Sequence, residues 1–128
     1  MRVAKDDVDV RMQIPGVTIR QRMGFGSVSG YDQLCGEYFT LAKGVDTTPL
    51  LAGLEGDACQ SPHWGFVLRG QVTTTDGAGH TETAAAHDLF YWPPGHNVRV
   101  DEDAELIMFS PQHEHVAVVN HIRAKVGA

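Results

Sequence analysis

The feature that most constrains the fold is a series of short apolar segments with a period of two, each ended by glycine or proline. The first segment, Val8–Ile14, alternates apolar and polar residues and stops at Pro15-Gly16. Asp76-Gly77 and Pro93-Pro94-Gly95 mark later turns. This period is typical of strands with one wet face. With 14 glycines and 6 prolines in 128 residues, the pattern argues against a helical bundle and predicts an all-β sandwich or barrel.

Roughly nine strands and one helix are expected in a single domain, residues 1–128. Ser110-Pro111 predicts a helix start, because serine caps helices and proline is favoured in their first turn. The helix should run for about fifteen residues, end at Gly127 and bury one apolar stripe. That stripe is Val116, Val119, Ile122 and Val126. The expected strands are residues 8–14, 17–22, 37–41, 63–69, 71–75, 80–86, 89–92, 97–100 and 105–109, with a kink at Gly70 and an acidic turn at 101–103.

Charge and hydropathy restrict the partners of the chain. Ten basic and sixteen acidic residues give a net charge of −6 at pH 7, which argues against nucleic acid because a phosphate backbone attracts basic surfaces. The apolar runs are far shorter than the roughly 18 residues that span a bilayer, and the first ten residues carry no signal-peptide hydrophobic region. We therefore expect a cytoplasmic protein that binds neither nucleic acid nor membrane.

The two cysteines, Cys35 and Cys59, match neither a disulfide framework nor a Cys-x-x-Cys motif. Asp57, Cys59 and His63 share parity, so in an extended segment their side chains project to one side. A thiolate, imidazole and carboxylate set favours zinc or another borderline or soft metal over magnesium or calcium. The alternative for each residue is structural: a buried small thiol at Cys59, a hydrogen-bonded His63 and a loop carboxylate at Asp57.

Two segments resemble the motifs of the cupin superfamily. Residues 57–63 followed by Gly70 are similar to its first motif, and the VLRG sequence from Val67 is similar to the strand end of that motif. His87-Asp88 through Pro93-Pro94-Gly95 resembles the turn of the second motif, with His87 at the usual glycine. SPHWG and PPGH also resemble a small single-domain subfamily with CPHWG and PPGH sequences. The resemblance covers Asp57 to about Phe109 and implies a cupin-like β-barrel, or double-stranded β-helix (jelly roll), with a short C-terminal helix.

Carried over onto this sequence, the cupin ligand positions change residue type. Asp57 and Cys59 stand at the two histidines of the first motif, His63 stands at its glutamate, and Val98 stands at the histidine of the second. His96 lies two residues before Val98 and, on the same strand face, points into the barrel. The resemblance thus implies a divalent-metal site, zinc or iron, formed by Cys59, His63, His96 and Asp57.

Aromatic residues beside these positions form a candidate small-molecule pocket, although aromatics at strand alternation are commonly core residues. The pocket candidates are Trp64, Phe66, Tyr91, Trp92 and Val98. The remaining histidines are expected at the surface, since a His-x-His pair does not share a helix face. They are His80, His113, His115 and His121.

Two classes of function remain open. One is a metal-dependent enzyme of oxygenase, isomerase or hydrolase type, in which Cys59, His63 and His96 hold the metal. The other is a binding or regulatory protein, metal-free or with a structural metal, that holds a small molecule without catalysis; the fold alone does not separate the two. Cupins of this size are commonly homodimers, so the resemblance also implies a homodimer, with Val8–Ile14 or the helix at the contact.

Overall fold

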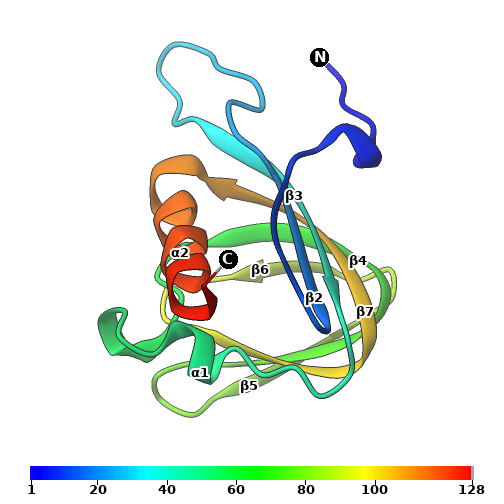
Figure 1. Ribbon diagram of the computed structural model, residues 1–128, viewed down its shortest axis with the longest axis vertical. Coiled ribbons are helices and arrows are strands. Elements are labelled where there is room, and N and C mark those ends of the chain that lie inside the picture. The colour runs from blue at the N-terminus through cyan, green and yellow to red at the C-terminus, as the bar shows by residue number, and fades with distance from the viewer. Residues whose placement is uncertain (128) are drawn as a thin grey trace.

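Seven antiparallel strands form one strongly bent sheet in the computed structural model, which describes residues 1–127 (Figure 1). The strand order is β1-β2-β3-β7-β4-β5, and β6 pairs with β4. The sheet is open, with β1 and β5 at the ends of this order, and the all-β prediction is confirmed. The elements are η1 (Lys5–Asp7), β1 (Val10–Ile14), β2 (Val17–Arg22), β3 (Leu34–Leu41), α1 (Thr48–Leu51), η2 (Glu55–Asp57), β4 (His63–Thr75), β5 (Thr81–Ala85), β6 (Leu89–Trp92), β7 (Asn97–Pro111) and α2 (Gln112–Val126).

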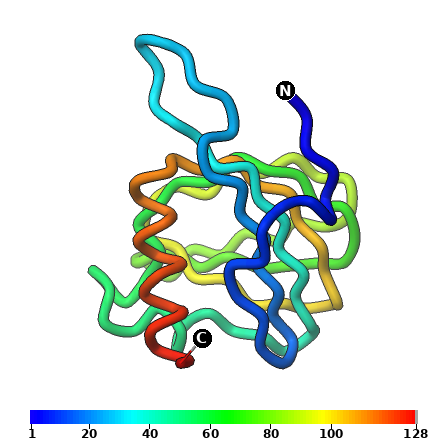
Figure 2. The backbone as a smooth tube through the Cα atoms, turned by 45° about the horizontal axis from the view of Figure 1, so that its top comes forward, coloured from blue at the N-terminus to red at the C-terminus, as the bar shows by residue number. Residues whose placement is uncertain are grey.

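The two longest strands, β4 and β7, bend and so carry the sheet around the interior (Figure 2). The first part of β4 pairs with β6, and the second part pairs with β5, while β7 follows β4 along both parts. The register shifts between Val67 and Val72, around Gly70, whose φ is 82°. A Cβ at Gly70 would lie 2.1 Å from the carbonyl oxygen of Asp103. Only glycine permits this close approach, as the expected kink requires.

Helix α2 packs beside the open side of the barrel and against α1 (Figure 1). It ends at Gly127, whose φ of 74° is left-handed, so the predicted helix is confirmed. The predicted stripe was in part wrong, because Val118 is buried in place of Val116. The prediction that Ser110 caps the helix was also wrong, because its hydroxyl points into the interior and donates to Glu37. Among residues 1–127, no helix combines the length and the apolar character needed to cross a membrane.

The strand boundaries differ from expectation in two places. Residues 101–103 lie inside β7 and not in a turn, so β7 unites two expected strands, as β4 does. Their carboxylates find donors outside the core: Asp101 accepts from the Thr73 hydroxyl at 2.6 Å, and Asp103 accepts from the Lys43 amide at 2.8 Å. The acidic residues are therefore compatible with a continuous strand, and the expected nine strands become seven in the described part of the chain.

Inward-facing residues form rows across β2, β3 and β7. Two of these rows are apolar, and the row beyond them contains the buried polar side chains of Gln21 and Glu37. The three rows are Val17–Leu41–Ala104, Ile19–Phe39–Leu106 and Gln21–Glu37–Met108. Because neighbouring strands keep this register, polar side chains gather at one end of the interior and apolar side chains at the other.

Candidate metal centre

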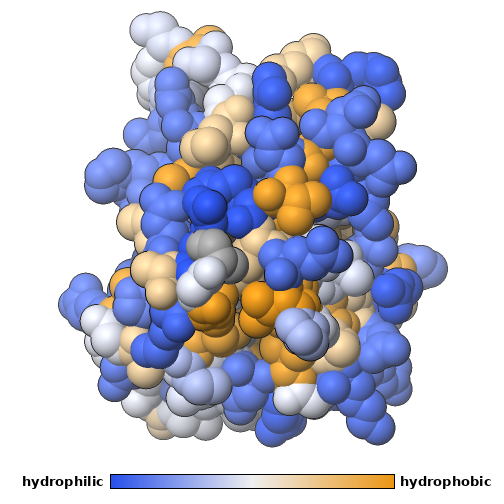
Figure 3. All heavy atoms as spheres, in the orientation of Figure 1, coloured by the Kyte–Doolittle hydropathy of each residue, from blue (hydrophilic) through white to orange (hydrophobic). Residues whose placement is uncertain are grey.

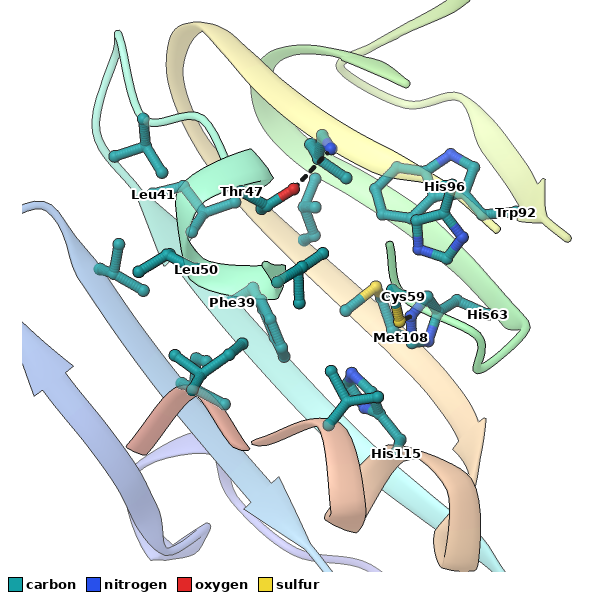
Figure 4. Close-up of a pocket in the computed structure, with 18 of the residues that line it drawn as sticks. Phe39, Leu41, Thr47, Leu50, Cys59, His63, Trp92, His96, Met108 and His115 are labelled. Atoms are coloured by element: carbon teal, nitrogen blue, oxygen red, sulfur yellow. Dashed lines mark hydrogen bonds between the residues drawn. The ribbon is translucent and has the colours of Figure 1, made fainter. Parts of the chain in front are cut away.

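Cys59, His63 and His96 come from separate segments and meet at the polar end of the interior (Figure 4). A short antiparallel bridge holds Cys59 beside His96: the Cys59 amide donates to the His96 carbonyl at 2.9 Å. His63 begins β4, and its Nε2 lies 3.4 Å from the Cys59 Sγ. One ligand atom from each residue lies within 4.8 Å of the other two, and all three side chains are buried. The protein thus collects one sulfur and two nitrogen donors at one point.

The two imidazoles of this group are oriented by bonds at Nδ1. His63 Nδ1 donates to the Ser110 hydroxyl at 2.6 Å, and that hydroxyl donates to Glu37 Oε1 at 2.5 Å. His96 Nδ1 donates to the Pro93 carbonyl at 2.7 Å. A carbonyl or carboxylate only accepts, so the imidazole proton resides on Nδ1. The lone pair of Nε2 is left for another partner, which is how metal-binding histidines are held by their outer shell.

His115 is a third buried imidazole beside this group, and its expected place at the surface was wrong. It is 3% exposed, its Nδ1 donates to Glu37 Oε2 at 2.5 Å, and its ring centroid lies 4.3 Å from that of His63. The cause is the phase of α2: His115 precedes the buried Val119 by four residues and Ile122 by seven, which places it on the same helix face. Counting His115 into the apolar stripe would have revealed this from the sequence.

Glu37 is the buried carboxylate that links these histidines, and the sequence analysis did not select it. Besides Ser110 and His115, it accepts from Gln21 Nε2 at 2.7 Å. Burial by itself raises the pKa of Glu37, but the charge of His115 and these hydrogen bonds together lower that pKa below its ordinary value. The sequence did contain a signal for its burial: Glu37 is two residues from Phe39 and four from Leu41, so on a strand it faces the same side as these apolar residues.

The electrostatics of the cluster make Cys59 a thiolate. Burial raises the pKa of Cys59, but its contacts with the three imidazoles, foremost the hydrogen bond with His115, outweigh burial and lower the pKa to about 3. For His115, burial lowers the pKa, whereas the Glu37 carboxylate raises it and brings it to about 9. Burial and the nearby His115 charge lower the pKa of His63 to about 4, so that imidazole is neutral at pH 7.

The other predicted site residues lie in different surroundings. Asp57 is exposed at the end of η2, where its Oδ1 accepts from the Gly53 amide at 2.9 Å, and it does not join the Cys59 group. Trp92 and Val98 line the central cavity. The other three pocket candidates point away from the interior, because they alternate with inward-facing residues on β4 and β6; they are Trp64, Phe66 and Tyr91. The rings of Trp64 and Tyr91 stack with their centroids 5.4 Å apart, and both residues are about half exposed.

The remaining histidines differ in exposure and in backbone conformation. His80 and His113 are exposed, as expected, with side-chain exposures of 83% and 95%. His121 is partly buried and its Nε2 donates to the Ala52 carbonyl at 2.9 Å, so its expected surface role is corrected to a link between α2 and the segment after α1. His87 has a φ of 74°, which explains why glycine is usual at this position of the cupin motif.

A cavity leads from the thiolate and imidazoles into the apolar interior (Figure 4). About 60 Å³ of it is open to the centres of water-sized molecules, several times the volume that one ordered water requires. Figure 4 shows Cys59, His63 and His96 on one side of the cavity and Leu41 and Leu50 on the other. The donor atoms therefore face a space that a small molecule can enter.

Solved structures with the same architecture identify the fold. An RmlC-like cupin from Shewanella frigidimarina superposes with a TM-score of 0.59 at 16% identity, over 89% of this chain and 93% of the other. The chain has the cupin fold. The polyketide cyclase RemF from Streptomyces resistomycificus gives a TM-score of 0.57 at 19% identity, over 87% of this cupin-fold chain and 78% of RemF.

Bacillus subtilis oxalate decarboxylase, a protein described with Mn(II) centres, gives a TM-score of 0.58 at 20% identity over 84% of this chain. The chain spans only 28% of that protein and 31% of the Lactobacillus farciminis oxalate decarboxylase. No protein-family model and no curated protein matches the sequence. At such identities the likeness establishes the cupin fold and not an activity.

Proposed function

We propose that this cupin-fold protein binds one divalent metal ion through Cys59, His63 and His96 and uses it to bind or transform a small molecule in the adjoining cavity. One observation carries the proposal. The Nε2 atoms of two buried histidines face a buried thiolate, while their Nδ1 atoms are held by Ser110 and Pro93. Histidines that bind metals in proteins are commonly held by outer-shell partners in this way, which supports the proposal.

The donor set favours zinc or iron. One thiolate and two imidazoles suit borderline first-row metals, whereas magnesium and calcium prefer oxygen donors. His115 is not in the group of mutually close ligand atoms that Cys59, His63 and His96 form. Three protein ligands leave a coordination position for the small molecule. We assign His115 a positioning role, since its Nδ1 is bound to Glu37.

Each protein group has a definite task in this proposal. A bound divalent ion would supply Lewis-acid polarisation of its small-molecule ligand. Glu37 orients His63 through Ser110 and orients His115 directly, so the donors are preorganised. The apolar cavity wall excludes water, which strengthens every electrostatic interaction at the centre. A cytoplasmic location fits this chemistry, because a reducing compartment keeps Cys59 free of disulfides.

Elemental analysis of purified protein that has never met a chelator tests the proposal. We expect close to one zinc or iron per chain, and we expect His63→Ala combined with His96→Ala to abolish it. The matched control is His80→Ala combined with His113→Ala, which removes two exposed histidines and should leave the metal content unchanged. Metal-free wild-type protein would contradict the proposal and favour the alternative, a metal-free binding or regulatory cupin. Sedimentation of the same samples tests the homodimer that the cupin resemblance implies.

A further inference from the structure

The wall of the central cavity is polar only at one end. Beyond Cys59, His63, His96 and His115, every lining residue of the described chain except Thr47 is apolar. The Thr47 hydroxyl has no proton left to donate to a ligand, because it donates to Asn97 at 2.9 Å while accepting from the Val98 amide at 2.8 Å. A ligand is therefore offered polar partners at the donor cluster and apolar contacts elsewhere.

The length of the cavity follows from the sheet register: its lining runs from Met108, which pairs with Glu37 at the polar end, through Phe39 to Leu41 at the apolar end. Four residues of strand correspond to roughly 13 Å. The centres of water-sized molecules have only about 60 Å³ available in this cavity, so a cavity of this length is narrow. It suits an extended chain better than a bulky ring system.

The apolar end of the cavity reaches the surface. Val45 and Leu50, which line it, are only partly buried. Figure 3 shows hydrophobic side chains at the surface between the C-terminal part of α2 and the β1–β2 hairpin, the elements that contribute Ile122 and Val17 to the lining. A chain-like molecule can thus enter from this side and place its leading group at the donor cluster.

We propose that the cavity binds a monocarboxylate with an unbranched aliphatic chain, its carboxylate at the metal and its chain along the apolar lining. This proposal rests on the function proposed above. A divalent ion with one thiolate ligand keeps one positive charge, and a single carboxylate balances that charge. A cationic head group would meet that positive charge. A second charged group that lies within the apolar part of the cavity, short of its opening, would be buried without a partner, at a large cost in free energy.

Isothermal titration of octanoate into the zinc-loaded full chain tests this inference. We expect octanoate to bind, and hexanoate to bind about 15-fold more weakly, because each buried methylene contributes about fourfold to affinity. Octylamine and the dicarboxylate suberate should show no binding. Equal affinity for octanoate and octylamine, or for octanoate and suberate, would overturn the proposed head-group chemistry or the proposed orientation of the chain.

A matched pair of variants locates the binding. Val45→Trp fills the outer part of the cavity, whereas Val28→Trp adds the same side chain at a 63% exposed position outside it. We expect Val45→Trp to keep its zinc and lose octanoate affinity at least tenfold, and Val28→Trp to behave as wild type. Leu50→Trp serves the same purpose if Val45→Trp does not fold.

The outcomes separate the two proposals. Wild-type protein that binds neither zinc nor iron contradicts the proposed function. Zinc-loaded protein that fails to bind octanoate, or a Val45→Trp variant that folds and binds octanoate as tightly as wild type, contradicts the proposed ligand class while leaving the metal site in place.

Discussion

Cys35 and Cys59 are both buried free thiols, with exposures of 0% and 4%. Their surroundings nevertheless shift the two thiol pKa values in opposite directions. Burial and the negative charge of Glu37 raise the pKa of Cys35 to about 12. Cys59 is about as deeply buried, but three imidazoles surround it, and their contacts, foremost the hydrogen bond with His115, lower its pKa to about 3. Burial alone therefore does not decide whether a thiol is an inert core residue or a ligand.

The difference originates in a single carboxylate. Glu37 lies two residues from Cys35 on β3 and opposes ionisation of that thiol directly. The same carboxylate raises the pKa of His115, whose proton then stabilises the Cys59 thiolate. One buried charge thus keeps one cysteine neutral and supports the ionised form of the other.

The largest expected contrast is the ionisation state of the two thiols. Metal-free protein at pH 7 should contain one thiolate per chain, because this pH lies above the pKa of Cys59 and below that of Cys35. Ultraviolet thiolate absorbance measures it. Cys59→Ser should remove the signal and Cys35→Ser should leave it intact; the reverse result would show that the two environments have been assigned wrongly.

Metal affinity should separate the cysteines next. Cys59→Ser is expected to weaken zinc binding by more than the roughly 10- to 100-fold that loss of an outer-shell partner costs, because it removes a ligand atom. Cys35→Ser should not change zinc affinity, since Cys35 is absent from the donor clusters of the described chain. Competition with a chromophoric chelator measures both constants. Equal effects from the two variants would mean that Cys59 has no special role.

The role of Glu37 can be isolated with a smaller effect. Glu37→Gln keeps the shape of the side chain but removes the charge that orients His115 and, through Ser110, His63. Zinc affinity should fall roughly 10- to 100-fold, and the pKa of Cys35 should fall because its neighbouring negative charge is gone. Glu82→Gln, at an exposed position, is the matched control. Unchanged zinc affinity in Glu37→Gln would reduce Glu37 to a structural residue.

The smallest effect concerns stability against pH in the metal-free protein. Because the pKa of His115 is raised from 6.5 to about 9, protonated His115 stabilises the folded protein fully below pH 6.5. This stabilisation is lost as the pH rises from 6.5 toward about 9. The lowered pKa of Cys59 acts in the opposite sense, adding stability as the pH rises toward the ordinary thiol value of 9.0. The two slopes oppose each other, so wild-type stability should be nearly flat between pH 6.5 and 9.

Urea unfolding across this interval checks the balance. In Cys59→Ser only the His115 contribution remains, so the free energy of unfolding should decrease as the pH rises. Cys35→Ser should stay flat over most of this interval, because the pKa of Cys35 is about 12 in the folded chain and its ordinary value of 9.0 lies at the upper end of the interval. A flat profile in Cys59→Ser would show that the pKa of His115 is not raised in the folded protein.

Local patterns were sufficient for most of the fold. The period of two located the strands, Gly70 located the bend, and the helix ended at Gly127 as its left-handed conformation requires. The error at residues 101–103 arose because they have turn composition but lie within β7. Their carboxylates are satisfied by partners distant in sequence, such as Thr73 and Lys43, and composition does not report such partners.

The sequence by itself determined most of the strands and the helix, and it selected Cys59, His63 and His96 as candidate ligands from two separate motif-like segments. Only the tertiary structure decided that Glu37 and His115, separated by 78 positions, complete the cluster, and that Asp57 does not join it. The physical reason is that side-chain parity is a local property of a strand. The row in which a buried side chain meets its partners depends on strand register and on the packing of α2, which are set by the whole sheet.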